Sequence, residues 1–126
     1  MASPASRREL VRMLTLDEMS DDLENLTVSI MPGINRDAAE SGMTIEKSEV
    51  VLALVELVEL GWATAYLPQS HELVEIEGMP PLDNLEGQNG AWFYITDAGR
   101  KAQNEYDCWP FDEQGEPRKD WTPPEN

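Results

Sequence analysis

Apolar residues recur at helical spacing in the first third of the chain. Leu10 and Leu14, four residues apart, predict a short helix over residues 6–14. Thr15 has the character of an N-cap, and Glu18 three residues later completes the capping-box pattern. The apolar residues that follow at spacings of 4, 3 and 4 predict one face of a second helix: Met19, Leu23, Leu26 and Ile30.

Proline and glycine predict the ends of the next elements. Pro32 and Gly33 follow Ile30 directly and are expected to end the second helix. Residues 37–41 predict one or two further helical turns, which Gly42 stops. This part of the chain is therefore expected to contribute one helix and a short helical segment.

The longest apolar pattern predicts a helix over residues 45–60. Thr44 is its expected cap, and Gly61 is well placed to end it in a left-handed conformation. Valine and leucine make a wide apolar face, so we expect this helix to be the core helix, buried on most sides, with Leu52 broadening the apolar face. Four residues form the narrow stripe that is left exposed: Glu46, Glu49, Ala53 and Glu56.

After this helix the pattern changes to the alternation typical of strands. Residues 62–67, 71–77 and 91–95 are predicted strands, and the glycine- and proline-rich residues 78–90 are a predicted loop. Thr96 is the expected cap of a last helix over residues 97–106.

The third predicted strand is rich in aromatic residues. Trp92 and Tyr94 are expected on one of its faces, and Phe93 and Ile95 on the other. A small sheet cannot bury both faces alone, so one face has to be covered by the C-terminal tail or a second subunit, or remain open to a partner.

The order of these elements resembles the winged helix-turn-helix superfamily, which is familiar from small bacterial transcriptional regulators. The resemblance covers residues 16–106 and is carried by VLALVELVELGW (51–62) and YITDAGRKA (94–102). These stretches are similar to the end of that family's recognition helix and to the segment that leaves its wing. The resemblance implies an α+β, winged-helix-like domain over residues 1–106, in which residues 1–14 are an arm or short helix. It also implies three or more helices and a two- to three-stranded antiparallel wing.

The charge of the chain argues against the DNA binding that is usual for this shape. Its 25 acidic and 9 basic residues give a net charge of −16, and residues 13–99 hold 17 of the acids but only Arg36 and Lys47 as bases. Nucleic-acid affinity comes largely from basic groups that displace counterions from phosphates. The predicted wing has no Lys or Arg, and Glu46 and Glu49 stand where a recognition helix would make its contacts. The remaining bases lie near the two ends: Arg7, Arg8, Arg12, Arg100, Lys101, Arg118 and Lys119.

The sequence offers little catalytic chemistry. His71 is the only histidine and Cys108 the only cysteine, so no two-histidine or cysteine metal motif exists and no disulfide forms within the chain. Cys108 is expected to be a packed thiol rather than a nucleophile, and His71 a solvated turn residue. We therefore expect no catalytic residue, metal site or cofactor. The chain also lacks a long apolar run or a signal-peptide pattern, which favours a cytoplasmic protein without a membrane partner.

Residues 107–126 are predicted to be an irregular tail rich in proline, aromatic and acidic residues, which packs on the domain or on a partner. Our main hypothesis is a non-enzymatic protein-interaction or regulatory module that forms a homodimer and offers an acidic face to a basic protein. Two alternatives stay open: a DNA-binding transcriptional regulator, and an acidic DNA mimic that inhibits a basic protein. The candidate partner-binding residues are Trp92, Tyr94, Trp109, Phe111, Glu46, Glu49 and Glu56.

Overall fold

The first helix, α1 (Arg7–Glu18), runs straight through the predicted boundary at Thr15. Ser6 caps it, because its hydroxyl accepts from the Glu9 N–H at 3.1 Å. Thr15 is fully buried, and its hydroxyl donates to the Val11 carbonyl at 2.7 Å instead of capping a new helix. The predicted capping box is therefore wrong, since the apolar face of α1 continues past Thr15 into the core.

The predicted second helix over residues 16–30 is also wrong. The chain instead forms the short strand β1 (Glu24–Asn25) and one turn of π-helix (Leu26–Ile30). Asn25 ends the strand and caps this turn: it is fully buried, and its side-chain oxygen accepts from the N–H groups of Thr27 and Val28, both at 3.1 Å. The predicted apolar positions Met19, Leu26 and Ile30 are still buried, but Met19 lies at the end of α1 and the other two lie in the π-helical turn.

Pro32 and Gly33 lie in the first turn of helix α2 (Met31–Glu40) rather than after a helix. Proline is tolerated there, because the N–H groups of a first turn have no partner within the helix. Gly33 lies close to the Glu18 carboxylate: a Cβ atom at this position would be 1.8 Å from Oε1, so the glutamate side chain would have to move aside. Gly42 has a φ of +75° and follows the end of α2, which confirms the predicted stop.

Helix α3 (Lys47–Glu59) is the core helix that the sequence predicts. Glu46 stands at its N-cap rather than Thr44, and Gly61 follows its end with a φ of +76°, as predicted. The exposed stripe was misplaced by the pattern: Ala53 is buried, and Leu52 is 56% exposed. The reason is that the face carrying Ala53 packs against α1.

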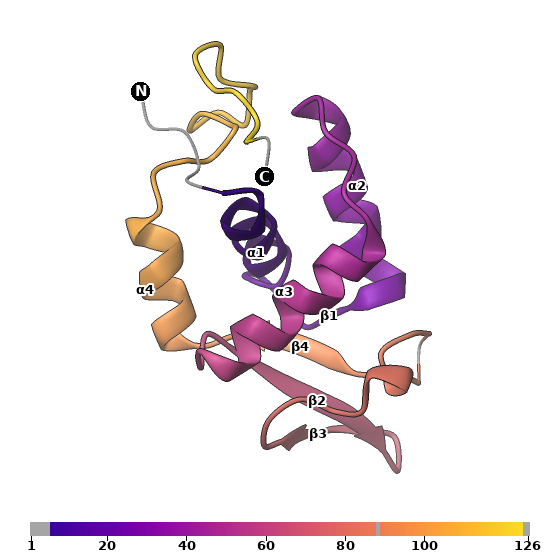
Figure 1. Cartoon of the computed structure of the whole chain (residues 1–126). Helices are drawn as coiled ribbons and strands as arrows, with labels where there is room; N and C mark the ends of the chain where they lie inside the picture. The colour runs from indigo at the N-terminus through magenta and orange to yellow at the C-terminus, as the bar shows by residue number, and fades with distance from the viewer. Residues whose placement is uncertain (1–5, 88, 125–126) are drawn as a thin grey trace.

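The sheet is antiparallel and has the strand order β1-β4-β2-β3, with β2 (Ala63–Gln69), β3 (Glu72–Ile76) and β4 (Trp92–Ile95) close to their predicted ranges. β1 makes the sheet one strand larger than expected. The predicted alternation in β4 is confirmed, because Phe93 and Ile95 are buried while Trp92 and Tyr94 are half-buried on the other face. Figure 1 shows α3 across the inner face of this sheet, with α1 behind it.

The last helix, α4 (Asp97–Glu105), begins as predicted at Thr96, whose hydroxyl accepts from the Gly99 N–H at 3.1 Å. Gly99 lies so close to the preceding turn that a Cβ atom would be 2.1 Å from the Trp62 carbonyl oxygen. The C-terminal segment of residues 107–124 is irregular and packs through Trp121, which is 8% exposed and donates from Nε1 to the Cys108 carbonyl at 2.8 Å. Figure 1 shows this segment at the top of the view, above α1 and α4 and away from β2 and β3.

The computed structural model describes residues 6–87 and 89–124. The first five residues of the predicted arm, one residue of the predicted loop and the last two residues of the predicted tail lie outside the described residues. Within the described part the chain is an α+β structure of four helices and a four-stranded antiparallel sheet.

Candidate functional site

The outer face of the sheet is aromatic. Tyr66 pairs with Trp92 across β2 and β4, and Thr64 pairs with Tyr94 in the same way. Their side chains therefore share the face that points away from α3. All four residues are half-buried. The predicted partner-binding residues Trp92 and Tyr94 are thus brought together on one surface.

A hollow of about 280 Å³ lies at one edge of this aromatic face. It is lined by Tyr66 and Tyr94 from the sheet and by Asp21, Asp22 and Leu23 from the loop between α1 and β1. Within the described residues, neither tyrosine hydroxyl has a hydrogen-bond partner, and the Asp21 carboxylate has none. The Asp22 carboxylate accepts only from the Leu23 N–H, at 2.8 Å.

A larger groove of about 550 Å³ runs between the C-terminal end of α1, α4 and the C-terminal segment. We call it the acidic groove. Its aromatic wall consists of Tyr106, Trp109 and Phe111, and Arg100 is the one basic residue among those lining it. Asp21 lines both this groove and the hollow on the sheet, so the two sites adjoin. The carboxylates of the acidic groove are Asp17, Asp21, Asp112 and Glu113.

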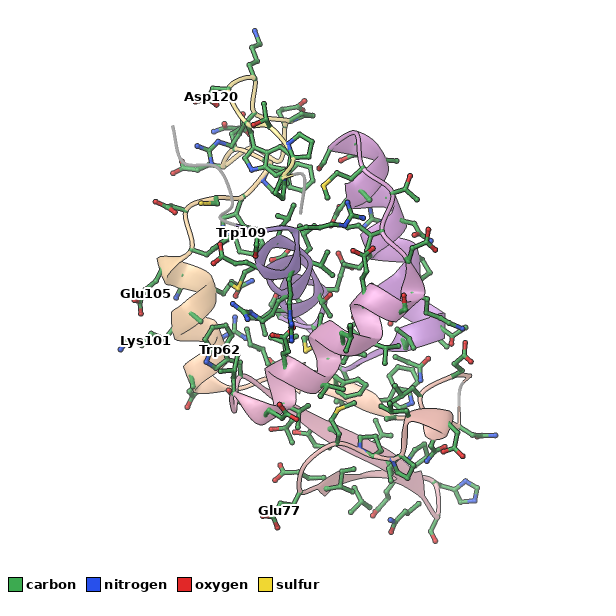
Figure 2. All side chains as sticks on the ribbon, in the orientation of Figure 1. Trp62, Glu77, Lys101, Glu105, Trp109 and Asp120 are labelled. Atoms are coloured by element: carbon green, nitrogen blue, oxygen red, sulfur yellow. The ribbon has the colours of Figure 1, made fainter. Side chains whose placement is uncertain are left out.

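The predicted residues Trp109 and Phe111 therefore lie in a groove and not in the core. Trp109 packs edge-on against Tyr106, with ring centroids 4.8 Å apart. Figure 2 shows Asp120 at the end of the molecule opposite Glu77, which follows β3, with Trp109 between them. The tail and the outer face of the sheet are thus separate surfaces, and they meet at Asp21, which lines both the acidic groove and the hollow.

A pair of carboxyl groups stands where the acidic groove continues between α1 and α2. Burial, followed by a hydrogen bond with Asp37 and its negative charge, raises the pKa of Glu18 to about 8. Burial also raises the pKa of Asp37 and, together with the charges of Asp37 and Asp21, that of Asp17. Arg36 lies nearby and its charge favours the ionised forms, yet the pKa of both paired carboxyls stays raised. Glu18 is therefore largely protonated at neutral pH, mainly because it is buried.

The glutamates of α3 have a different environment from the one predicted. Arg7 donates from Nε to Glu49 Oε1 at 2.6 Å, and this hydrogen bond lowers the pKa of Glu49. Glu56 accepts from Arg8 Nε at 2.8 Å and from Arg12 Nη1 at 3.2 Å. Both carboxylates are thus occupied by arginines of α1. Among the three predicted glutamates, Glu46 alone is exposed to solvent.

The basic residues near the chain ends are mostly bound to the protein itself. Besides the three arginines of α1, Arg100 donates to the Ser20 carbonyl at 2.8 Å, and Arg118 donates to the Trp109 carbonyl at 3.0 Å. Lys101 is exposed and 4.0 Å from Glu105, and Lys119 is exposed. The seven bases lie on α1, α4 and the C-terminal segment, and the five arginines among them are all bound to groups of the protein itself.

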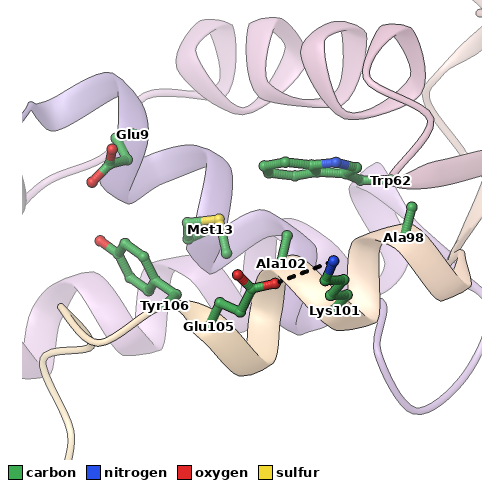
Figure 3. Close-up of a pocket in the computed structure, with 8 residues that line it drawn as sticks. All are labelled: Glu9, Met13, Trp62, Ala98, Lys101, Ala102, Glu105 and Tyr106. Atoms are coloured by element: carbon green, nitrogen blue, oxygen red, sulfur yellow. Dashed lines mark ion pairs between the residues drawn. The ribbon is translucent and has the colours of Figure 1, made fainter.

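A third groove of about 470 Å³ lies between α1 and α4. Figure 3 shows the Trp62 ring facing it from one side and Tyr106 closing one end, with Met13 between them. Arg12 lies over the Trp62 ring, 5.6 Å from its centroid, and shields part of this wall. The mixed Lys101–Glu105 rim gives this groove no dominant charge.

Neither Cys108 nor His71 lines any of these grooves. The Cys108 thiol is buried, which raises its pKa and disfavours the nucleophilic thiolate. His71 is exposed in the turn between β2 and β3. Among the described residues, no three histidine, cysteine or acidic side chains are grouped to hold a metal ion. In the same part of the chain, no helix combines the length and apolarity needed to cross a membrane.

No pattern in the sequence predicted the acidic groove. Asp17 and Glu18 were assigned to the first turn of a helix that does not start there, and Asp37 belonged to a segment without an apolar pattern. No spacing in the sequence relates these residues to Phe111 or Glu113, because only the packing of four separate segments brings them together. The high density of acidic residues was the one available signal, and it does not locate a site.

Comparison of the chain with protein-family models, with curated proteins and with solved structures found no match.

Proposed function

We propose that this chain is a non-enzymatic protein-interaction module that docks a basic segment of a partner protein along the acidic groove. The observation that carries the proposal is the composition of this groove. Four carboxylates and three aromatic rings line it, together with a single arginine that already donates to a backbone carbonyl. Such a surface complements lysine and arginine side chains by charge and by cation–π contact.

The use of the arginines inside the fold supports this proposal. Three of them are paired with Glu49 and Glu56 of α3, so these two carboxylates are not open to a partner, whereas the four carboxylates of the acidic groove are exposed. Burial raises the pKa of Glu18 to about 8, so this carboxyl is largely protonated at neutral pH, and a bound cation would favour its ionised form. The negative charge that attracts a basic segment to the groove comes from its exposed carboxylates.

The proposal places the module on a winged-helix-like scaffold. The order of three helices, the β2–β3 hairpin, β4 and a last helix agrees with that scaffold, and β1 is an addition to it. A DNA-binding role finds less support. At the N-terminal end of α3 the bases Arg7 and Lys47 are already paired with Glu49 and Glu86, and the β2–β3 hairpin has no Lys or Arg. Neither place therefore offers phosphates an unpaired Lys or Arg.

The test uses defined ligands with matched charge variants. Fluorescent deca-arginine, deca-lysine and deca-glutamate peptides and a random-sequence DNA duplex are titrated with the protein at about 150 mM salt, where long-range attraction is screened. The groove variant is D17N/E40Q/E113Q, in which all three changes lie on residues lining the acidic groove or its continuation between α1 and α2. The matched control is E72Q/E77Q/D83N, which removes the same charge from exposed positions near the hairpin.

We expect the two basic peptides to bind and the groove variant to bind them about tenfold more weakly than the control, a difference of about 1.4 kcal/mol. Equal weakening by both variants would mean that only net charge attracts the peptides, and it would overturn the assignment of the groove. Binding of the duplex in preference to the peptides would instead favour the regulator hypothesis.

A further inference from the structure

The hollow on the outer face of the sheet differs chemically from the acidic groove beside it. Its walls are two tyrosine rings, its rim is two aspartates, and Leu23 adds an apolar side. No basic residue lines it, and Arg100, which lines the adjoining groove, donates to the Ser20 carbonyl. The hollow is thus an aromatic slot with an acidic edge and no cation of its own.

Tyr66 and Tyr94 are near enough for both rings to contact one bound group. Thr64 pairs with Tyr94, so Tyr66, two residues further along β2, is the diagonal neighbour of Tyr94 on the same face. Diagonal neighbours in antiparallel sheets are about 7–8 Å apart, which is within reach of aromatic side chains. Both tyrosines line the hollow, so a flat group that enters it can contact the two rings.

The size and charge of the hollow limit which groups can occupy it. Its volume of about 280 Å³ lies below the roughly 300–1,000 Å³ of typical small-molecule sites but accommodates one long side chain. Asp21 has no hydrogen-bond donor among the described residues, and one oxygen of Asp22 is bound to the Leu23 N–H. Carboxylates at the edge of an aromatic slot match the guanidinium group, which stacks on aromatic rings and donates two parallel hydrogen bonds to a carboxylate.

We infer that this hollow is a binding site for a single arginine side chain of a partner protein, stacked between Tyr66 and Tyr94 and paired with Asp21 or Asp22. The inference rests on the proposed function, because it names one residue of the basic segment that this function requires. Lysine fits less well, since its ammonium group is compact and strongly hydrated and does not fill a flat slot. The position of Asp21 between the two sites lets one segment reach both.

The test is an NMR titration of the whole chain with N-acetyl-arginine N-methylamide. The citrulline analogue serves as the neutral isostere and the lysine analogue as the non-planar cation. We expect saturable shifts of the Leu23, Tyr66 and Tyr94 amides with the arginine compound, at least fivefold weaker binding of the lysine compound, and no saturable shift with the citrulline compound. Shifts spread evenly over the acidic surface, or equal binding of the arginine and lysine compounds, would overturn the inference.

Variants separate this site from the acidic groove. Y94A is expected to weaken arginine-compound binding at least fivefold, Y94F to retain it, and D21N/D22N to weaken it more than the charge-matched control E72Q/E77Q. Amide shifts report whether each variant stays folded. If deca-arginine binds along the acidic groove but the hollow gives no shift with the arginine compound, the inference about the hollow is wrong and the proposed function stands. If deca-arginine does not bind at all, both the inference and the proposed function are wrong.

Discussion

The Arg7 guanidinium and the Glu49 carboxylate join the first turn of α1 to the first turn of α3 through two hydrogen bonds, of 2.6 and 3.1 Å. Both side chains are 28% exposed, so water screens the pair only in part. The same Glu49 carboxylate accepts from the Glu46 N–H at 2.8 Å. One side chain therefore ties two helices together and satisfies a free N–H group at the start of α3.

Neutralising Glu49 and Glu56 together is expected to destabilise the protein. E49Q/E56Q removes the ionic part of all three pairs with α1 and is expected to lower the free energy of unfolding by about 2 kcal/mol. The charge-matched control E59Q/E72Q changes exposed glutamates and is expected to stay within about 0.5 kcal/mol of the parent. Urea unfolding at low and high salt measures both. Equal effects of the two variants would show that the pairs add nothing beyond net charge.

Stability is expected to fall as the pH rises from about 4.5 to about 8. The pKa of Glu18 is about 8 in the folded protein, against an ordinary value of 4.5, so the folded state holds more protons than the unfolded state in this interval. Stability therefore decreases with pH there and levels off above it. The raised pKa values of Asp17 and Asp37 act in the same direction. Urea unfolding at a series of pH values measures the slope.

The variant E18Q is the control for this slope. Glutamine carries no titratable proton, so the decline over this interval is expected to be smaller, and the variant is expected to be more stable than the parent above a pH of about 8. If the stability of the parent protein rises through the same interval, the raised pKa of Glu18 is contradicted.

Replacing Gly99 by alanine is expected to destabilise the junction of α4 with the preceding turn. The added Cβ atom would lie 2.1 Å from the Trp62 carbonyl oxygen, a backbone atom that cannot turn aside. We expect a loss of at least about 2 kcal/mol, although alanine favours a helix intrinsically. Thermal unfolding of G99A and of N104A, an exposed position of the same helix, makes the comparison. A stabilised G99A would contradict the close approach.

Removing the Trp121 side chain is expected to release the C-terminal segment. The indole is 8% exposed and donates to the Cys108 carbonyl, and Cys108 is itself buried. W121A is therefore expected to raise the rate at which a disulfide reagent modifies Cys108 by at least about tenfold, since access to the thiol limits that reaction. P123A, at an exposed position of the same segment, is the control. An unchanged rate in W121A would mean that other contacts hold the segment.

Local sequence signals were reliable where one residue decides a local geometry. Thr96 caps α4, Gly61 ends α3 in the left-handed conformation, and Gly42 ends the region of α2. The alternation in β4 placed Phe93 inside and Tyr94 outside. In each case the reason lies within a few residues of the chain, in a free N–H group, a positive φ or the two-residue period of a strand.

The sequence by itself thus determined the α+β class, the later helices and strands, and the scarcity of bases in the central region. Tertiary structure decided the rest. Thr15 became a buried interior residue because the apolar face of α1 continues, and Pro32 became a first-turn residue because Asn25 broke the expected helix earlier. The arginines of α1 pair with Glu49 and Glu56, which lie more than 40 residues further along the sequence, and Asp17 and Phe111 line the same groove. Such long-range pairings depend on how helices pack, and no local pattern encodes them.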